Sequence, residues 1–239
     1  MVAGRSLLER VWRISKSVSG VGRVVVATDD ERISAHVAQF GGESVLTSPT
    51  CRNGSERVFE AVSKLRSPAE TIVNVQGDAV LMPPWVISAL VEQMRREPAV
   101  QIATPAVRLS REQLDSMMRM KAQGIVSGTT VAFDAFHNAM YFSKAIIPFM
   151  RSTTSGELSP VYQHIGVYAY RPEALKRYIS LPAGAFEEVE QLEQLRALEH
   201  GMPIRVVEVS MQNRTMWSVD NPQDVSRCEA IIKEEGELV

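Results

Sequence analysis

The sequence has few of the features that would tie it to an oxidising compartment, a membrane or nucleic acid. Its two cysteines, Cys51 and Cys228, lack metal-site spacing, so we interpret both as reduced thiols of a cytoplasmic protein. No apolar run approaches the roughly 18 residues of a membrane span, and the amphipathic N-terminus lacks the apolar core of a secretory signal. With a net charge of −2 and both signs well mixed, the chain also lacks the basic footprint of a nucleic-acid-binding protein.

What is present is the composition of an ordinary globular domain. The chain has 239 residues, of which 45% are apolar and 23% charged, which is sufficient for a large buried core. Up to about residue 100, β-branched runs alternate with amphipathic stretches, which predicts an α/β fold with a three-layer, doubly wound, mostly parallel mixed sheet. The closely spaced runs IVSGTTVAFD and NAMYFSK favour an antiparallel insertion. We therefore expect one domain over residues 1–239.

Two aspartates occupy comparable positions in distant segments. Asp78 in NVQGDAVLMPP and Asp220 in SVDNPQDV each follow a strand-like stretch and precede a helical one. Carboxylates at the carboxyl ends of strands lie where open α/β sheets bind ligands, and a pair of them can hold Mg²⁺ beside substrate phosphates. This arrangement predicts chemistry on a nucleoside triphosphate. The alternative interpretation is that both aspartates cap the helices that follow them.

The order of several segments carries more information than any one of them. Along the chain lie TSPTCRNGSERV, NVQGDAVLMPP, HIGVYAYR with EQLEQLRALE, and SVDNPQDV, with VVVATDDERI and MYFSKAIIPF between them. In this order the chain closely resembles the 3-deoxy-manno-octulosonate (Kdo) cytidylyltransferases, or CMP-Kdo synthetases, over nearly its whole length. The resemblance implies a nucleotide-diphospho-sugar transferase-like fold, usually in a homodimer. It also implies transfer of CMP from CTP to the anomeric hydroxyl of Kdo, with release of pyrophosphate, for lipopolysaccharide assembly.

The same resemblance implies where the nucleotide and the metal bind. It assigns Mg²⁺ to Asp78 and Asp220, and it assigns the nucleotide to Gly54, Ser55 and Arg57. These three residues open a predicted helix, and the free N–H groups of a helix start favour anionic or polar ligands. A capping box between the Asn and the Glu of the NGSER segment explains the same residues without a ligand.

The resemblance assigns the sugar acid to five polar residues. His164 and Tyr168 are four positions apart, so we expect them to share one face of a strand. Glu190, Glu193 and Gln194 have the i, i+3, i+4 spacing of one helix face. The alternatives are half-buried strand residues with satisfied polar tips for the first pair, and an ordinary solvated helix face for the second set. The five assigned residues are Gln76, His164, Tyr168, Glu193 and Gln194.

Three departures from the family pattern shape the expectations for activity. Family members begin with a strand and a basic loop around the triphosphate, and this sequence starts after them, so we expect an N-terminally truncated chain with weak or no turnover. Ala79 and Val80 replace a family Glu-Pro, and residues 129–132 lack a basic residue. The open alternatives are a cytidylyltransferase for a related acidic sugar, such as 8-amino-Kdo, and a non-catalytic paralogue that acts as a dimerisation or sugar-binding module.

Overall fold

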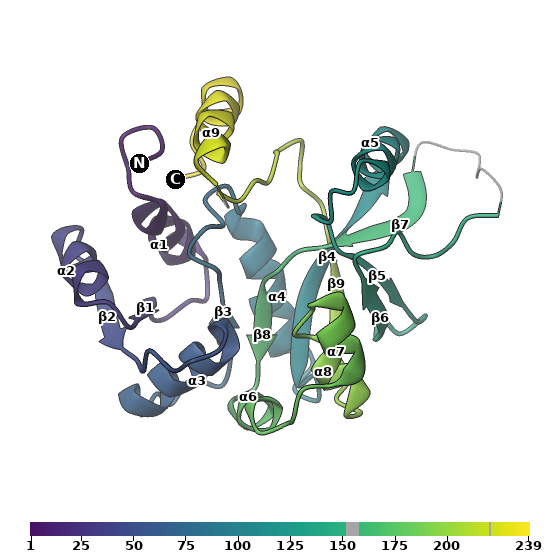
Figure 1. The fold of residues 1–239 in the computed structure, drawn as a ribbon. Helices are drawn as coiled ribbons and strands as arrows, with labels where there is room; N and C mark the ends of the chain where they lie inside the picture. Colours follow the sequence, from purple (N-terminus) through teal and green to yellow (C-terminus); the bar gives the residue numbers. More distant parts are fainter. Residues whose placement is uncertain (152–157, 220) are drawn as a thin grey trace. The chain divides into compact units, whose positions relative to one another are not determined.

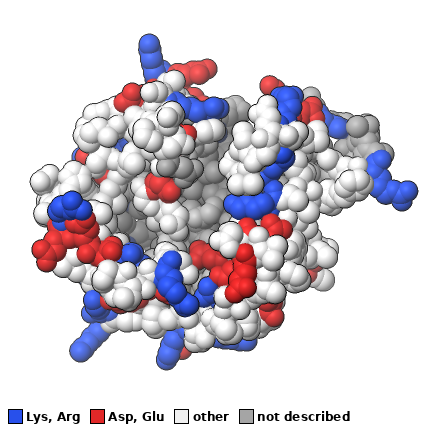
Figure 2. Space-filling view, in the orientation of Figure 1, with Lys and Arg blue, Asp and Glu red and all other residues white. Residues whose placement is uncertain are grey.

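The computed structural model describes residues 1–151, 158–219 and 221–239 (Figure 1). Two compact units divide the chain: residues 1–92 together with 211–239, and residues 93–210. None of the described helices is long and apolar enough to cross a membrane. On the face shown in Figure 2, basic and acidic side chains are interspersed, as the mixed charge of the sequence predicts.

The first unit consists of β-strands and α-helices in alternation, as the sequence pattern predicts. The strands β1 and β2 pair in parallel, and the helices α2 and α3 both pack against them. A core cluster joins the N-terminal residues to the last helix through Val2, Val11 and Cys228, among others. In chain order the elements are α1 (Leu7–Ser17), β1 (Val25–Thr28), α2 (Glu31–Gln39), β2 (Glu43–Leu46), α3 (Gly54–Leu65), β3 (Ile72–Asn74), α4 (Pro84–Arg96), whose last turn enters the second unit, and α9 (Pro222–Glu235).

Local signals explain why α2 begins and ends where it does. Asp30 caps its start, with the side chain accepting a hydrogen bond from the backbone N–H of Arg32. At the other end Gly41 has a φ of 75°, a left-handed conformation that glycine adopts without strain. A Cβ on Gly42 would lie 2.7 Å from Val37 and 2.8 Å from Phe40, so the chain can turn back there only without a side chain.

The second unit is a sheet with helices packed against it. The strand β4 lies beside β7, β8 and β9, and β5 lies between β7 and β6. The helix α5 packs against β4 and β7 through a cluster that includes Leu109, Leu114 and Val161. In chain order the elements are β4 (Ile102–Ser110), α5 (Arg111–Ala122), β5 (Thr130–Phe133), β6 (Ala139–Ser143), β7 (Leu158–His164), β8 (Tyr168–Tyr170), α6 (Pro172–Ile179), α7 (Ala185–Glu190), α8 (Leu195–Glu199) and β9 (Arg205–Val209).

The expectation of a mostly parallel sheet is wrong for this unit. Among its described strand pairs, only β4–β9 is parallel, whereas β4–β7, β4–β8, β5–β6 and β5–β7 are antiparallel. The predicted antiparallel pairing of β5 with β6 is confirmed. The reason is the short return after β5, where a turn at Asp134 replaces the crossover helix that a parallel connection needs. The antiparallel strands are thus the main part of this sheet.

A buried arginine joins the two ends of the chain within the first unit. The side chain of Arg10 is 4% exposed, and its guanidinium donates to the backbone carbonyl of Val2 at 2.9 Å and that of Ala3 at 3.2 Å. It also forms a bidentate pair with the carboxylate of Glu237, at 2.6 and 3.2 Å. Because the guanidinium is surrounded by acceptors, this contact fixes residues 2–3 and the C-terminal tail against α1.

Replacing Arg10 with Met should therefore destabilise the first unit. The variant keeps an apolar stem but leaves the carbonyl of Ala3 and the carboxylate of Glu237 without the guanidinium donor, so we expect a loss of about 2 kcal/mol in the free energy of unfolding. Arg13→Met on the same helix is the matched control, because its ion pair with Glu9 is exposed and should contribute under about 0.5 kcal/mol. Urea unfolding measures both, and equal losses would contradict the assignment.

Candidate functional site

Asp78 lies in a turn, outside any regular strand or helix. The strand β3 ends at Asn74, and α4 begins only at Pro84. Asp78 is therefore too far from α4 to be its cap, and the capping alternative is wrong for this residue. Gln76 and Asp78 do not share a strand face either, because both follow the end of β3.

The turn that holds Asp78 lies against the segment that leads into α9. The backbone N–H of Val219 donates to the carbonyl oxygen of Asp78 at 3.1 Å. Asp220, the next residue, lies outside the described residues. The cap of α9 is its neighbour Asn221, whose side chain accepts from the backbone N–H of Gln223. The structure thus brings Val219, which directly precedes the second predicted metal residue, to the turn that carries Asp78, although the two residues are 141 positions apart in the sequence.

The residues predicted to contact the nucleotide surround the start of α3. Asn53 caps this helix by accepting from the backbone N–H of Glu56 at 2.9 Å, so the capping contact is real. The side chain of Gln76 lies against Gly54, since a Cβ there would be 3.0 Å from the amide nitrogen. A side chain at position 54 would therefore displace Gln76, which explains a glycine in the first turn of α3.

The two other predicted nucleotide residues have contacts inside the protein. Ser55 is fully buried. The guanidinium of Arg57 forms an ion pair with Asp29 at 3.0 Å and donates to the hydroxyl of Thr47 at 2.7 Å. Arg57 thereby connects α3 to residues that follow β1 and β2. The contact of Ser55 and Arg57 with a nucleotide stays a prediction.

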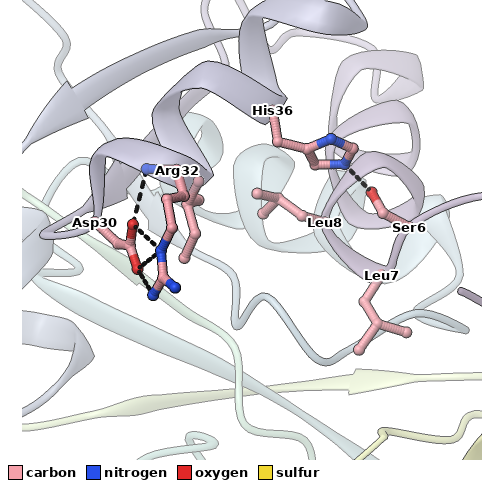
Figure 3. A pocket seen from close by; sticks show the side chains of 7 residues that line it. Ser6, Leu7, Leu8, Asp30, Arg32 and His36 are labelled. Atoms are coloured by element: carbon pink, nitrogen blue, oxygen red, sulfur yellow. Dashed lines mark hydrogen bonds and ion pairs between the residues drawn. The ribbon is translucent and has the colours of Figure 1, made fainter.

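A shallow cavity of about 550 Å³ opens in the same unit at the starts of α1 and α2 (Figure 3). The imidazole of His36 is hydrogen-bonded to the hydroxyl of Ser6 at 2.7 Å, while Arg32 lies against Asp30. One wall reaches the turn that carries Asp78, because the side chain of Leu8 lies 3.9 Å from where a Cβ on Gly77 would be. Sequence reasoning missed this cavity, which has no motif of its own. Its lining consists of Ser6, Leu7, Leu8, Asp30, Arg32, Ile33 and His36.

In the second unit, His164 is a buried and neutral imidazole. Its Nε2 lies 2.8 Å from the hydroxyl oxygen of Thr104, and that hydroxyl lies 2.8 Å from the carbonyl of Val167. Because the hydroxyl has one hydrogen to donate to the carbonyl, Nε2–H must be the donor to Thr104, which leaves Nδ1 as an acceptor. Burial, followed by the positive charge of Lys144, lowers the pKa of His164 to about 3.

His164 and Tyr168 do not lie on one strand as expected. His164 ends β7 and Tyr168 begins β8, because a tight turn with a hydrogen bond from Val167 N–H to the carbonyl of Ile165 separates them. Their rings nevertheless lie 5.5 Å apart. Tyr168 is 4% exposed, and burial raises the pKa of its hydroxyl. The structure thus brings the two rings together by a different route.

The expected continuous helix around Glu193 and Gln194 is also wrong. The helix α7 ends at Glu190, Gln191 adopts a left-handed φ of 54°, and α8 begins at Leu195. The alternative of a solvated face is wrong for Gln194, which is 5% exposed and whose amide nitrogen has no hydrogen-bond partner among the described residues. The carbonyl of Glu193 accepts from the hydroxyl of the buried Tyr178 at 2.8 Å. Both residues therefore belong to a tightly held loop.

Lys144, which the sequence-based assignment missed, contributes a positive charge near His164. It directly follows β6, is half-buried, and its charge lowers the pKa values of His164 and Lys121. The ammonium of Lys121 donates to three backbone carbonyls of residues 126–128, whereas that of Lys144 has no partner among the described residues. A basic residue ending the predicted strand MYFSK was the available signal.

Comparisons with known proteins match most or all of the chain. The sequence profile of the cytidylyltransferase family matches residues 2–204. The 3-deoxy-manno-octulosonate cytidylyltransferase of Maricaulis maris is 54% identical over 100% of this chain and 92% of its own length. The 8-amino-3,8-dideoxy-manno-octulosonate cytidylyltransferase of Shewanella putrefaciens is 36% identical over 95% of this chain and 88% of its own. These matches do not support the expected N-terminal truncation.

Solved structures agree with the sequence comparison. A structure of CMP:2-keto-3-deoxy-manno-octonic acid synthetase complexed with CTP matches with a TM-score of 0.85 at 30% identity, over 98% of this chain and 90% of that one. The 4-diphosphocytidyl-2C-methyl-D-erythritol synthase of Anaerococcus prevotii matches with a TM-score of 0.58 at 14% identity, over 98% and 88%, and at that identity the likeness concerns the fold alone. The fold is thus that of the nucleotide-diphospho-sugar transferases.

Proposed function

The chain belongs to the 3-deoxy-manno-octulosonate cytidylyltransferase family, and on that premise we propose that it transfers CMP from CTP to Kdo for lipopolysaccharide biosynthesis. The anomeric oxygen of Kdo attacks the α-phosphorus of CTP, the bond to pyrophosphate breaks, and the sugar hydroxyl loses its proton. Such a displacement depends on positioning and electrostatics and needs no covalent nucleophile from the protein. CTP and Kdo are both soluble, and the free Cys51 and Cys228 suit a cytoplasmic enzyme.

The observation that carries this proposal in the first unit is the contact between Val219 and Asp78. It joins Val219 to the Asp78 turn, and a pair of carboxylates contributed by Asp78 and Asp220 would suit a hard cation that prefers oxygen ligands. Mg²⁺ held there by Asp78 and Asp220 would neutralise charge on the α-phosphate and on the departing pyrophosphate. Gly54, Ser55 and Arg57, at the start of α3, position the nucleotide, and Gln76 extends from the same turn as Asp78.

The second unit supplies the groups for the sugar acid. The ammonium of Lys144 is the cation for the Kdo carboxylate, because it carries its charge beside neutral His164 without a partner among the described residues. Nδ1 of His164 accepts a hydrogen bond from a sugar hydroxyl, and Tyr168 lies against it. The unpartnered amide nitrogen of Gln194, in the loop that also holds Glu193, is available as a donor after a small movement of its surroundings.

Pyrophosphate release tests the proposed reaction directly. We expect release only when CTP, Kdo and Mg²⁺ are all present, and a preference for Kdo over 8-amino-Kdo, because the chain is 54% identical to a Kdo enzyme and 36% to an 8-amino-Kdo enzyme. A preference for 8-amino-Kdo would instead favour the alternative function of an 8-amino-Kdo cytidylyltransferase. A folded chain that releases no pyrophosphate with either sugar would contradict the proposed function.

We also propose that the enzyme works as a homodimer, as the resemblance implies. The second unit exposes several large apolar side chains, including Phe136, Met140 and Val189, which are 75%, 67% and 83% exposed. Met140 lies on β6, the last strand in the order of this sheet. Light scattering should give twice the 26.5 kDa mass of one chain.

A further inference from the structure

Both oxygens of the Glu190 carboxylate accept hydrogen bonds from groups inside the protein. One of its oxygens accepts a hydrogen bond from the hydroxyl of Ser143 at 2.7 Å, and the other accepts from the backbone N–H of Lys144 at 2.8 Å. The Ser143 hydroxyl in turn accepts from the backbone N–H of Ala145 at 2.9 Å. Ser143 is 3% exposed, so water cannot replace this contact from its side. Glu190 thus fixes the path of the backbone through residues 143–145.

This backbone segment determines where the Lys144 side chain begins. Lys144 carries the charge that acts on His164 and Lys121, and it forms no ion pair among the described residues. Glu190 is close enough to Lys121 to raise the pKa of that amine, which burial and Lys144 lower. Together these residues supply the two cations Lys121 and Lys144, the neutral imidazole of His164 and the carboxylate of Glu190. That carboxylate is bonded to backbone and hydroxyl donors rather than to the Lys144 ammonium. The four side chains keep a net positive charge that suits an anion.

Glu190 also stands at the start of the loop that holds Glu193 and Gln194. The helix α7 ends at Glu190, and the left-handed Gln191 turns the chain toward the buried Gln194. A single carboxylate therefore joins the segment at the end of β6, whose Lys144 acts on His164, to the loop that holds Glu193 and Gln194. Both of its oxygens accept hydrogen bonds from that segment in doing so.

We propose that Glu190 is a positioning residue for the acidic sugar, which holds the backbone of Lys144 so that its ammonium meets the sugar carboxylate. The inference rests on the proposed function, since it names how the sugar end of that same site is assembled. This positioning role differs from a purely structural one, because the loss of Glu190 should weaken the affinity for the sugar and not the affinity for the nucleotide. The nucleotide residues lie on other segments, so nucleotide affinity should be insensitive to Glu190.

Steady-state kinetics with each substrate varied in turn distinguish the two roles. For Glu190→Ala we expect the KM for Kdo to rise at least about tenfold, the size of one lost hydrogen bond to a charged group, while the KM for CTP stays within about twofold. Ser143→Ala should also raise the KM for Kdo, but by a smaller factor. Glu188→Ala, on the exposed side of α7, is the matched control and should change neither constant.

A double variant separates positioning from unrelated damage. Glu190→Ala added to Lys144→Met should raise the KM for Kdo no further than Lys144→Met alone, because both changes remove the same contact. An unchanged KM for Kdo in a folded Glu190→Ala, or additive effects in the double variant, overturns the inference while wild-type turnover leaves the proposed function intact. If Glu190→Ala does not fold, Glu190→Gln, which keeps one acceptor oxygen, carries the same comparison.

Discussion

Asp78→Asn should lower kcat for pyrophosphate release by about 10²- to 10³-fold, the effect of removing one preorganised electrostatic contact from a transition state. The substitution preserves the size of the side chain and the backbone carbonyl that accepts from Val219, but it removes the negative charge that holds the cation. Because Asp78 does not cap α4, the loss cannot be attributed to an unravelled helix start. The measurement is initial-rate pyrophosphate release with saturating CTP and Kdo over a range of Mg²⁺ concentrations.

Three further variants make this prediction specific. Asp220→Asn should cause a loss of similar size, and the double variant should be no slower than the worse single one, because the two carboxylates serve one cation. Asp115→Asn on α5, which makes the same chemical change in the second unit, should keep full activity. If Asp78→Asn retains more than half of the wild-type rate, the assignment of the metal to Asp78 is wrong.

The first unit could be predicted from the sequence because its signals are local. The run that forms β1, the cap Asp30 and the terminator Gly41 act on their immediate neighbours. The position of Asp78 outside the strand could not be predicted with the same certainty. It depends on where β3 ends and on the distant Val219, and neither is visible in the spacing of the residues.

The second unit departs from expectation where distant residues determine the local structure. His164 and Tyr168 read as one strand, but Thr104 bonds both to His164 and to the carbonyl of Val167 and so holds the turn between them. Likewise, a periodic pattern predicts one helix through Glu193, although its first part ends at Glu190, whose carboxylate is held at β6. In both places a polar residue bonded to another strand outweighs local propensity, and in both places the residues belong to the proposed sugar site.

Acidification should destabilise the protein through His164 well before its carboxylates are protonated. In the unfolded chain this imidazole takes up a proton below its ordinary pKa of 6.5, whereas in the folded protein the pKa is about 3. The unfolded state therefore binds the proton first, and stability that is fully present above pH 6.5 is lost progressively down to about pH 3. Between pH 7 and pH 5 the loss should be about 2 kcal/mol in the free energy of unfolding.

Urea unfolding at pH 7 and pH 5 measures this loss, and His164→Gln isolates it. Glutamine offers Thr104 an amide donor in place of Nε2–H but takes up no proton. Between pH 7 and pH 5 the free energy of unfolding of the variant should therefore fall by about 2 kcal/mol less than that of the wild type. His200→Gln is the matched control: His200 is only half-buried at the end of α8 and should leave the wild-type pH dependence unchanged. A His164→Gln variant with the same pH dependence as the wild type would show that His164 has the same pKa in the folded and the unfolded chain, which would contradict the lowered pKa of a buried imidazole.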